Sequence, residues 1–187
     1  YSDIVIVIIH GGHEHFHLPS PRMVSQYRFL AETGASIIIG HHTHCIGGFE
    51  VHKNVPIFYS LGNFLFTMKT GQESAYNGLV LSLKIQNGVM GNWDLIPVRL
   101  QNQTYILSKS EGEDQSNIIS EIEYYNDIIS DESLLLKKWD EFINKNIEET
   151  LFIFSPINVI RNERLRRALK KIGIGRFFMN KRLYNKI

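Results

Sequence analysis

The sequence predicts an α/β fold, and three observations support this fold class. Residues 4–9 (IVIVII) form a continuous run of β-branched residues, which is typical of a strand buried on both faces. Residues 35–39 (ASIII) form a second run of the same kind. Between the two runs, apolar residues recur at helical spacing. A strand, a helix and a strand in this order make a βαβ unit, whose two strands run parallel.

The helix of this unit is expected to open at Pro19 and Pro21 and to end at Thr33-Gly34. Proline is tolerated in the first turn of a helix, and glycine commonly follows the last turn. The apolar positions of the helix share one face: Met23, Tyr27, Leu30 and Ala31. This face is therefore expected to pack on the two strands.

Further strands are predicted after the βαβ unit. Residues 57–66 (IFYSLGNFLF) are apolar and aromatic, as a buried strand and its continuation would be. Residues 78–86 and 91–100 predict a β-hairpin, because the Asn87-Gly88 pair between them is a strong turn signal. The first hundred residues therefore combine parallel and antiparallel strands.

The character of the sequence changes after these strands. Residues 108–117 (SKSEGEDQSN) are polar and acidic and predict a loop or linker. Helical patterns follow in residues 118–129 and 134–147. We therefore expect three parts: a domain in 1–107, an acidic linker in 108–117 and a helical extension with a basic tail in 118–187.

Charge is unevenly distributed along the 187 residues, although the formal net charge is only +1. Residues 157–187 are rich in lysine and arginine and contain a single acidic residue, Glu163. A basic helix in this tail predicts contact with an anionic membrane surface, an acidic polymer or an assembly complex. The alternatives are a solvated basic face and docking on the acidic body of the same protein. Nucleic acid is disfavoured as a partner, because no recognition motif is present.

Three further observations limit the class of protein. The single cysteine, Cys45, excludes an internal disulfide framework and a cysteine-rich zinc module. No apolar run is long enough to span a bilayer. The sequence begins Tyr1-Ser2-Asp3 directly before an apolar strand, so we expect it to be part of a longer protein.

Residues 13–17 (HEHFH) match H-E-x-x-H, the zinc-protease motif. That motif needs a helix, because only there do histidines four positions apart face one ion. Gly11 and Gly12 precede it and prolines follow it closely, so a stable helix is not expected here. The protease interpretation is therefore disfavoured, and a solvated histidine-rich loop remains the simpler alternative.

A stronger metal-binding pattern lies at the ends of the two predicted parallel strands. His10 ends the first strand, and His41, His42 and His44 follow the second. Ligand sites of open α/β sheets lie at the carboxyl ends of the strands. Neutral imidazole is a good ligand for zinc, manganese and iron, so these histidines predict a divalent-metal site. The alternative is that they cap the strand ends through hydrogen bonds.

Three ordered blocks resemble the CapA family of capsule and poly-gamma-glutamate biosynthesis proteins, itself similar to calcineurin-like metallophosphoesterases. The blocks are DIVIVIIHGGHE (3–14), LAETGASIIIGHHTH (30–44) and VPIFYSLGNFLF (55–66). The resemblance extends over residues 3–100. It implies that the chain is the C-terminal half of a metallophosphoesterase-like β-sandwich flanked by helices.

The resemblance also implies roles for individual residues. His10, His42 and His44 would be metal ligands of a two-metal site, and His41 would contact phosphate or protonate a leaving oxygen. Glu14 matches the family glutamate and is assigned to catalysis. Tyr59, Ser60 and Asn63 match the closing block and are assigned to substrate binding. Glu14 therefore belongs to H-x-G-x-E counted from His10, not to the protease motif.

The chain departs from the family pattern in two ways. Gly11 stands where the family usually has tryptophan, and the upstream D-x-H, G-D and G-N-H blocks are not in this sequence. We therefore expect an N-terminal half to complete the site and the chain alone to be inactive.

The expected function is metal-dependent hydrolysis or transfer on a phosphoester or anionic polymer during surface-polymer synthesis. The expected location is the bacterial cell envelope or membrane. The alternative is a non-catalytic scaffold that binds an anionic polymer or a membrane.

Overall fold

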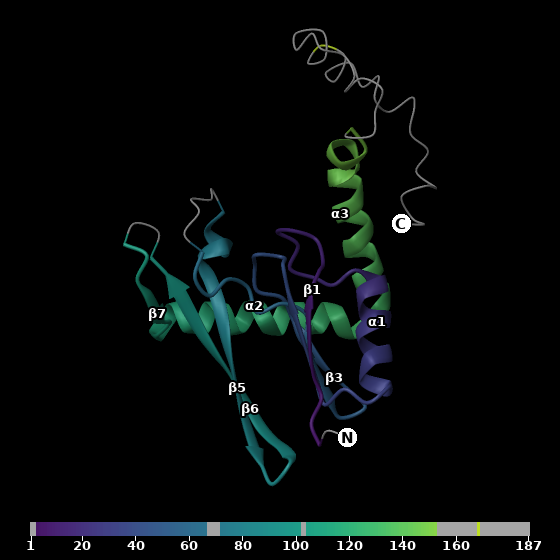
Figure 1. The fold of residues 1–187 in the computed structure, drawn as a ribbon. Helices are drawn as coiled ribbons and strands as arrows, with labels where there is room; N and C mark the ends of the chain where they lie inside the picture. The colour runs from purple at the N-terminus through teal and green to yellow at the C-terminus, as the bar shows by residue number, and fades with distance from the viewer. Residues whose placement is uncertain (1–2, 67–71, 102–103, 153–167, 169–187) are drawn as a thin grey trace. The chain divides into compact units, whose positions relative to one another are not determined.

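The computed structural model of the protein describes residues 3–66, 72–101, 104–152 and 168, without the side chains of 147–152 (Figure 1). It forms two compact units, Tyr1–Trp139 and Asp140–Ile187. The elements are β1 (Ile6–His10), α1 (Pro21–Glu32), β2 (Ile37–His41), β3 (Phe49–His52), β4 (Val55–Phe58), the 3₁₀ turn η1 (Glu73–Tyr76), β5 (Asn77–Gln86), β6 (Val89–Leu100), β7 (Leu107–Lys109), α2 (Gly112–Ser130) and α3 (Glu132–Phe152). The mixture of helices and two sheets confirms the predicted α/β class.

The first sheet contains the predicted βαβ unit. Its strand order is β1-β2-β4-β3. β1 pairs parallel with β2, and β2 pairs parallel with β4, while β3 runs antiparallel to β4. The register places Ile6 opposite Ile37 and His10 opposite His41. Because β1 and β2 run in the same direction, their two terminal histidines lie side by side.

β2 is buried on both faces, as its sequence predicts. Successive side chains of a strand point to opposite faces. Ile37 and Ile39 accordingly belong to one hydrophobic cluster and Ile38 to the other. Their exposed fractions are 0% for Ile37 and Ile38 and 8% for Ile39. β2 is thus the central strand that anchors the site.

β1 differs from its prediction, because it is an edge strand of the described sheet. The side chain of Ile6 is 43% exposed and that of Ile8 is 67% exposed. Only the opposite face of the strand, with Val7 and Ile9, packs against the core. The prediction of a strand buried on both faces is therefore wrong for β1 within the part of the chain that the structure describes.

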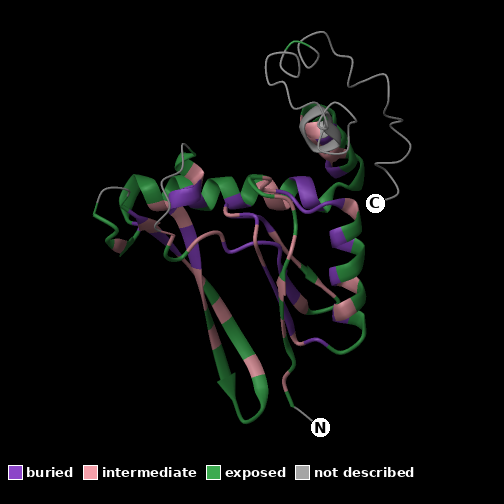
Figure 2. Cartoon of the chain, turned by 45° about the horizontal axis from the view of Figure 1, so that its top comes forward, coloured by how far each residue is buried: buried purple, intermediate pink, exposed green. Residues whose placement is uncertain are grey.

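α1 has the predicted boundaries and packs against β2 and β4. The hydroxyl of Ser20 accepts a hydrogen bond from the backbone N–H of Met23 (3.2 Å) and so caps the first turn. Pro21 is the first helical residue, and Thr33 ends the helix. Figure 2 shows buried and exposed residues alternating along α1, as expected for a helix with one face on a sheet.

The second sheet has the order β5-β6-β7 and is antiparallel. Its β5–β6 turn is the predicted Asn87-Gly88 hairpin, with both residues at positive φ (53° and 75°). Trp93 of β6 packs edge-on against the rings of Phe49 and Phe58, at centroid distances of 5.1 and 5.0 Å. One hydrophobic cluster therefore joins the second sheet to the first.

The segment predicted as an acidic linker is largely regular structure. β7 extends to Lys109, and α2 begins at Gly112. Glu113 and Asp114 occupy the first turn of α2, where negative charge is favourable. Ile118 and Ile122 of this helix are buried in the cluster that joins the two sheets. The acidic composition that indicated a loop thus belongs to a helix start, and the domain division stays a prediction.

The second predicted helix of the extension corresponds to α3. The basic tail and its expected contacts lie outside the described residues, apart from Ala168. Among the helices that the structure describes, none combines the length and hydropathy needed to cross a membrane.

Candidate metal centre

The candidate site forms where β1 and β2 end. His10 and His41 are the last residues of these strands and are paired in register. The loops that follow are joined by backbone hydrogen bonds. The N–H of Gly11 donates to the carbonyl of His41 (3.1 Å), and the N–H of His15 donates to the carbonyl of Thr43 (2.7 Å). These two bonds fix the loop after β1 against the loop after β2.

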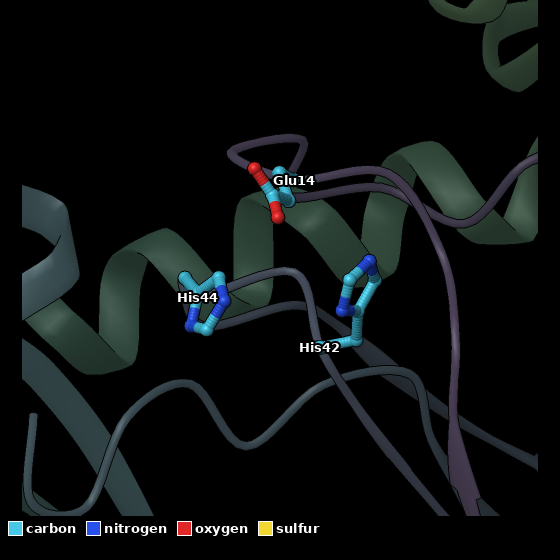
Figure 3. A group of neighbouring side chains, drawn as sticks. All are labelled: Glu14, His42 and His44. Atoms are coloured by element: carbon cyan, nitrogen blue, oxygen red, sulfur yellow. The ribbon is translucent and has the colours of Figure 1, made fainter.

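Glu14, His42 and His44 come together between these two loops. One possible ligand atom from each residue lies within 4.8 Å of the other two. Figure 3 shows the carboxylate of Glu14 reaching from its loop toward the two imidazoles. Two imidazoles and one carboxylate are a donor set that suits zinc, manganese or iron. These residues therefore fit the divalent metal that the sequence predicts.

His10 lies beside this group and contacts one of its members. Its Nε2 is 3.1 Å from Nδ1 of His42, and the two ring centroids are 4.8 Å apart. At that distance one of the two nitrogens carries the proton and the other accepts it. Nε2 of His42 keeps a lone pair for a ligand in the arrangement where Nδ1 of His42 is the donor. The structure therefore brings Glu14 rather than His10 together with His42 and His44.

His44 is held by Asn63. Nδ1 of His44 is 3.0 Å from Oδ1 of Asn63. The ring of Phe66 lies 4.9 Å from the His44 ring, centroid to centroid. The segment after β4 therefore borders the candidate group at His44.

Three histidines of the site have positive backbone φ angles. The values are 60° for His15, 99° for His42 and 58° for His44. Such conformations cost about 1–3 kcal/mol each in residues other than glycine, and they cluster at functional sites. The turn at His15 follows Glu14, whose carboxylate lies near the imidazoles of His42 and His44. Strain at these positions supports a functional interpretation of the histidines.

A buried hydroxyl network supports the loop that carries His42 and His44. The hydroxyls of Thr43 and Ser60 are 2.8 Å apart, and both lie near the carbonyl oxygen of Cys45 (3.0 and 2.9 Å). Thr43 and Ser60 are only 4% and 3% exposed. Ser60 was assigned to substrate binding, but in the structure its side chain supports the loop from the core.

Tyr59, also assigned to substrate binding, is likewise buried. Its ring stacks on Tyr27, and its hydroxyl donates a hydrogen bond to Oε1 of Glu50 (2.5 Å). Glu50 also accepts two hydrogen bonds from Arg28, of 2.9 and 2.6 Å. The structure therefore gives Tyr59 a partner in the core, and of the three assigned residues only Asn63 contacts a histidine of the candidate centre.

The environment favours neutral imidazole at two positions near the centre. Burial lowers the pKa of His41, and the neighbouring His10 lowers it further. Burial also lowers the pKa of His13, followed by the influence of His42. A neutral imidazole is better suited to accept a proton than to donate one. The role of His41 as a proton donor stays a prediction, and its environment favours the reverse transfer.

The protease motif does not form the helix that it requires. Residues 13–17 make a turn and an irregular segment. Nδ1 of His17 donates to the carbonyl of Ile46 (2.7 Å), and its ring stacks on Tyr125 at 5.0 Å. His17 thus fixes the loop to the body of the protein instead of facing the ligands of the candidate centre.

Trp139 was not predicted to lie near the site. Its ring is 4.9 Å from that of His13 and 5.8 Å from that of Phe16. These contacts hold the loop that bears Glu14. Helical spacing alone could not reveal this, because the contact joins segments more than a hundred residues apart in sequence.

The residues of the candidate centre lie in a region that is similar to known bacterial proteins. Residues 1–68 match the family described as bacterial capsule synthesis protein PGA_cap. The chain is 34% identical to capsule biosynthesis protein CapA of Bacillus anthracis over 100 residues, which cover 54% of this chain and 24% of the relative. It is 31% identical to PGA biosynthesis protein CapA of Bacillus subtilis (strain 168) over 122 residues, covering 65% and 32%.

A third relative is the uncharacterized protein y4sH of Sinorhizobium fredii, with 38% identity over 68 residues, covering 35% of this chain and 15% of the relative. The predicted resemblance to the CapA family is confirmed over the matched region. The chain spans about a quarter to a third of the length of the two CapA relatives.

Proposed function

We propose that this chain is part of a bacterial protein of capsule or poly-gamma-glutamate synthesis, and that it supplies a metal-dependent site acting on a phosphoester or an anionic polymer. The observation that carries the proposal is the group formed by Glu14, His42 and His44. The group lies within the residues that match PGA_cap. The names of the two CapA relatives support the biological role.

In this proposal Glu14, His42 and His44 hold one divalent ion, which when bound would polarise a substrate oxygen and make a water molecule more acidic. His41 is next to this group in sequence and would transfer a proton. Neutral imidazoles at this position and at His13 leave the site without a fixed positive charge from these two residues. Charge for binding an anion would therefore come mainly from the ion.

The predicted two-metal site would need ligands beyond this group. Within the described residues, the group contains three ligand residues, and His10 is hydrogen-bonded to one of them. A second ion would therefore use His10 together with carboxylates from elsewhere in a longer protein. This arrangement remains a proposal.

A scaffold that holds an anionic polymer without cleaving it is the second candidate. Its support is the exposure of Glu14 and His10, which leaves the group open to a large ligand. The enzyme needs the metal and cleaves or transfers its substrate, whereas the scaffold, with or without a metal, binds the polymer or membrane without cleaving it.

The first experiment is elemental mass spectrometry on the full-length protein and on a His42→Ala/His44→Ala double variant. We expect near-stoichiometric manganese, zinc or iron in the wild type and its loss in the double variant. His52→Ala is the matched control, because His52 pairs with Glu32 and not with the group. A wild type that stays metal-free after reconstitution would overturn the metal-dependent function. Hydrolysis assays on phosphoester and polymer substrates then separate the enzyme from the scaffold.

A further inference from the structure

We infer that Asn63 is a positioning residue, which fixes His44 in the tautomer protonated on Nδ1 and so leaves Nε2 as the ligand atom. The inference deepens the proposed function and rests on it for the identity of the ligand. It concerns a residue assigned from sequence to substrate binding, and it gives that residue a different task.

The orientation of the Asn63 amide follows from its neighbours. Its Nδ2 lies 2.8 Å from the carbonyl oxygen of Ala75 and 3.3 Å from that of His44. A carbonyl oxygen only accepts hydrogen bonds, so the NH₂ end of the amide must face these two atoms. The other end, Oδ1, consequently faces the His44 ring.

The tautomer of His44 follows from that orientation. Oδ1 of Asn63 is an acceptor, and it lies 3.0 Å from Nδ1 of His44. Nδ1 must therefore carry a proton. A neutral imidazole has one N–H, so Nε2 keeps its lone pair. Histidines that bind metals usually donate their other N–H to a protein acceptor in this way, which orients the ring and raises its basicity.

The position of Asn63 is itself fixed by the second sheet. Gly62 forms a bridge with Gly78 at the start of β5. A Cβ on Gly78 would overlap the backbone carbonyl of Asn63, so the two segments approach more closely than a side chain would allow. Ala75, which accepts from the amide, belongs to η1 directly before β5. The second sheet therefore holds the amide that orients His44.

His42 provides a contrast within the same centre. Its Nδ1 faces another imidazole, Nε2 of His10, at 3.1 Å. Either nitrogen can be the donor in such a pair, so the contact alone does not determine the tautomer. The tautomer of His44, by contrast, is fixed, because the Asn63 amide can present only its oxygen to the His44 ring.

The test is a long-range ¹H–¹⁵N correlation spectrum of the metal-free chain labelled at histidine, with His44→Gln to identify the His44 signals. We expect the Nδ1–H pattern for His44 in the wild type. Asn63→Leu removes the acceptor and should give a mixture of tautomers. Asn63→Asp retains an oxygen opposite Nδ1 but loses the donors to the carbonyls of Ala75 and His44, so it should keep more of the Nδ1–H form than Asn63→Leu does.

Calorimetric titration with Zn²⁺ tests the consequence for the ligand. Groups that hydrogen-bond to a metal-binding imidazole typically change the metal affinity about 10–100-fold, so we expect a loss of about that size in Asn63→Leu and a smaller loss in Asn63→Asp. Asn126→Ala is the control, because the Asn126 side chain accepts from the Phe49 N–H (2.7 Å) and serves the fold alone. It should change neither the tautomer nor the Zn²⁺ affinity.

The outcomes separate this inference from the proposed function. An Nε2–H pattern in the wild type, or an unchanged pattern in Asn63→Leu, would overturn the role of Asn63. If the wild type binds Zn²⁺, an equal affinity in Asn63→Leu would also overturn it. If the wild type shows the Nδ1–H pattern but binds no Zn²⁺, the orienting role of Asn63 stands and the metal-dependent function fails.

Discussion

β1 and β2 are neighbours in one sheet, have almost the same β-branched sequence and each end in a histidine, but their surroundings differ. β2 has a paired strand on each side, and its isoleucines are almost fully buried. β1 is paired on one side within the described residues, and Ile8 is 67% exposed. Two strands with similar sequences can therefore differ in burial, one lying inside the sheet and the other at its edge, while both position histidines of the same candidate site.

Substitution of one glycine near each strand is the first test of this comparison, and a large effect is expected in β2. A Cβ on Gly40 of β2 would overlap the backbone carbonyl of Tyr59, which cannot move as a side chain can. We expect Gly40→Ala to lower the free energy of unfolding by about 3 kcal/mol, at the upper end of the range for overpacked cores. Gly11, after β1, would meet only a methyl group of Ile9 at 3.9 Å. Urea denaturation should therefore show Gly11→Ala close to wild type, and equal losses in both variants would contradict the comparison.

Isoleucine truncations give a second difference, of similar size. Ile38 is 0% exposed and lies in the core between α1 and the sheet. We expect Ile38→Ala to cost about 2–5 kcal/mol, because it removes buried methyl groups and leaves a cavity. Ile8→Ala should change the free energy of unfolding by less than about 0.5 kcal/mol, as exposed positions usually do. Thermal or urea unfolding of the two variants measures both values. A loss at Ile8 as large as that at Ile38 would show that β1 is covered in solution.

At the other edge of the sheet, Glu50 of β3 is expected to make a smaller contribution to the free energy of unfolding, and that contribution depends on pH. Burial alone would raise the pKa of Glu50, but the hydrogen bonds from Arg28 and then Tyr59 outweigh it, so the pKa is lower than usual. A carboxyl with a lowered pKa in the folded state stabilises the protein above its unfolded pKa, about 4.3. This contribution is lost as the pH falls through the lower, folded-state pKa.

We therefore expect Glu50→Gln to lose about 1 kcal/mol at pH 7, as hydrogen bonds to a charged group contribute about that much after allowance for solvent. The loss should shrink as the pH is lowered below 4. Urea denaturation at pH 7 and pH 3.5 measures it. Glu73→Gln is the control, because Glu73 is 77% exposed in its pair with Arg99. A Glu50→Gln loss that is the same at both pH values would contradict the assignment.

Much of the fold could be predicted because local signals and tertiary structure agree. The prolines of α1 and the Asn87-Gly88 turn act through backbone conformations that these residues favour. The apolar face of α1 acts through its helical spacing, which predicts the side that is buried. The burial of β1 could not be predicted, because the sequence of a strand does not say how many strands pair with it. The start of α2 was missed because acidic residues suit both a loop and a first helical turn.

The candidate site was predicted in outline for a similar reason. Parallel strands end at the same edge, so His10 and His41 had to meet. The position of Glu14 depends on a turn with positive φ at His15. This conformation is uncommon in residues other than glycine, so it could not be predicted from a histidine in the sequence. The contact between Asn63 and His44 depends on how the second sheet packs. These tertiary details decide which residues form the group of possible ligands.

The exposed edge of β1 also has a consequence for handling the protein. Residues 4–9 (IVIVII), which include most of β1, are apolar and β-branched and contain no proline, glycine or charge. Short segments of this composition at a sheet edge form cross-β assemblies, which natural proteins prevent with charged or proline residues at such edges. The solubility limit of this chain is therefore expected to depend on β1. A lysine in place of Ile8 should raise that limit while leaving the histidine loops untouched.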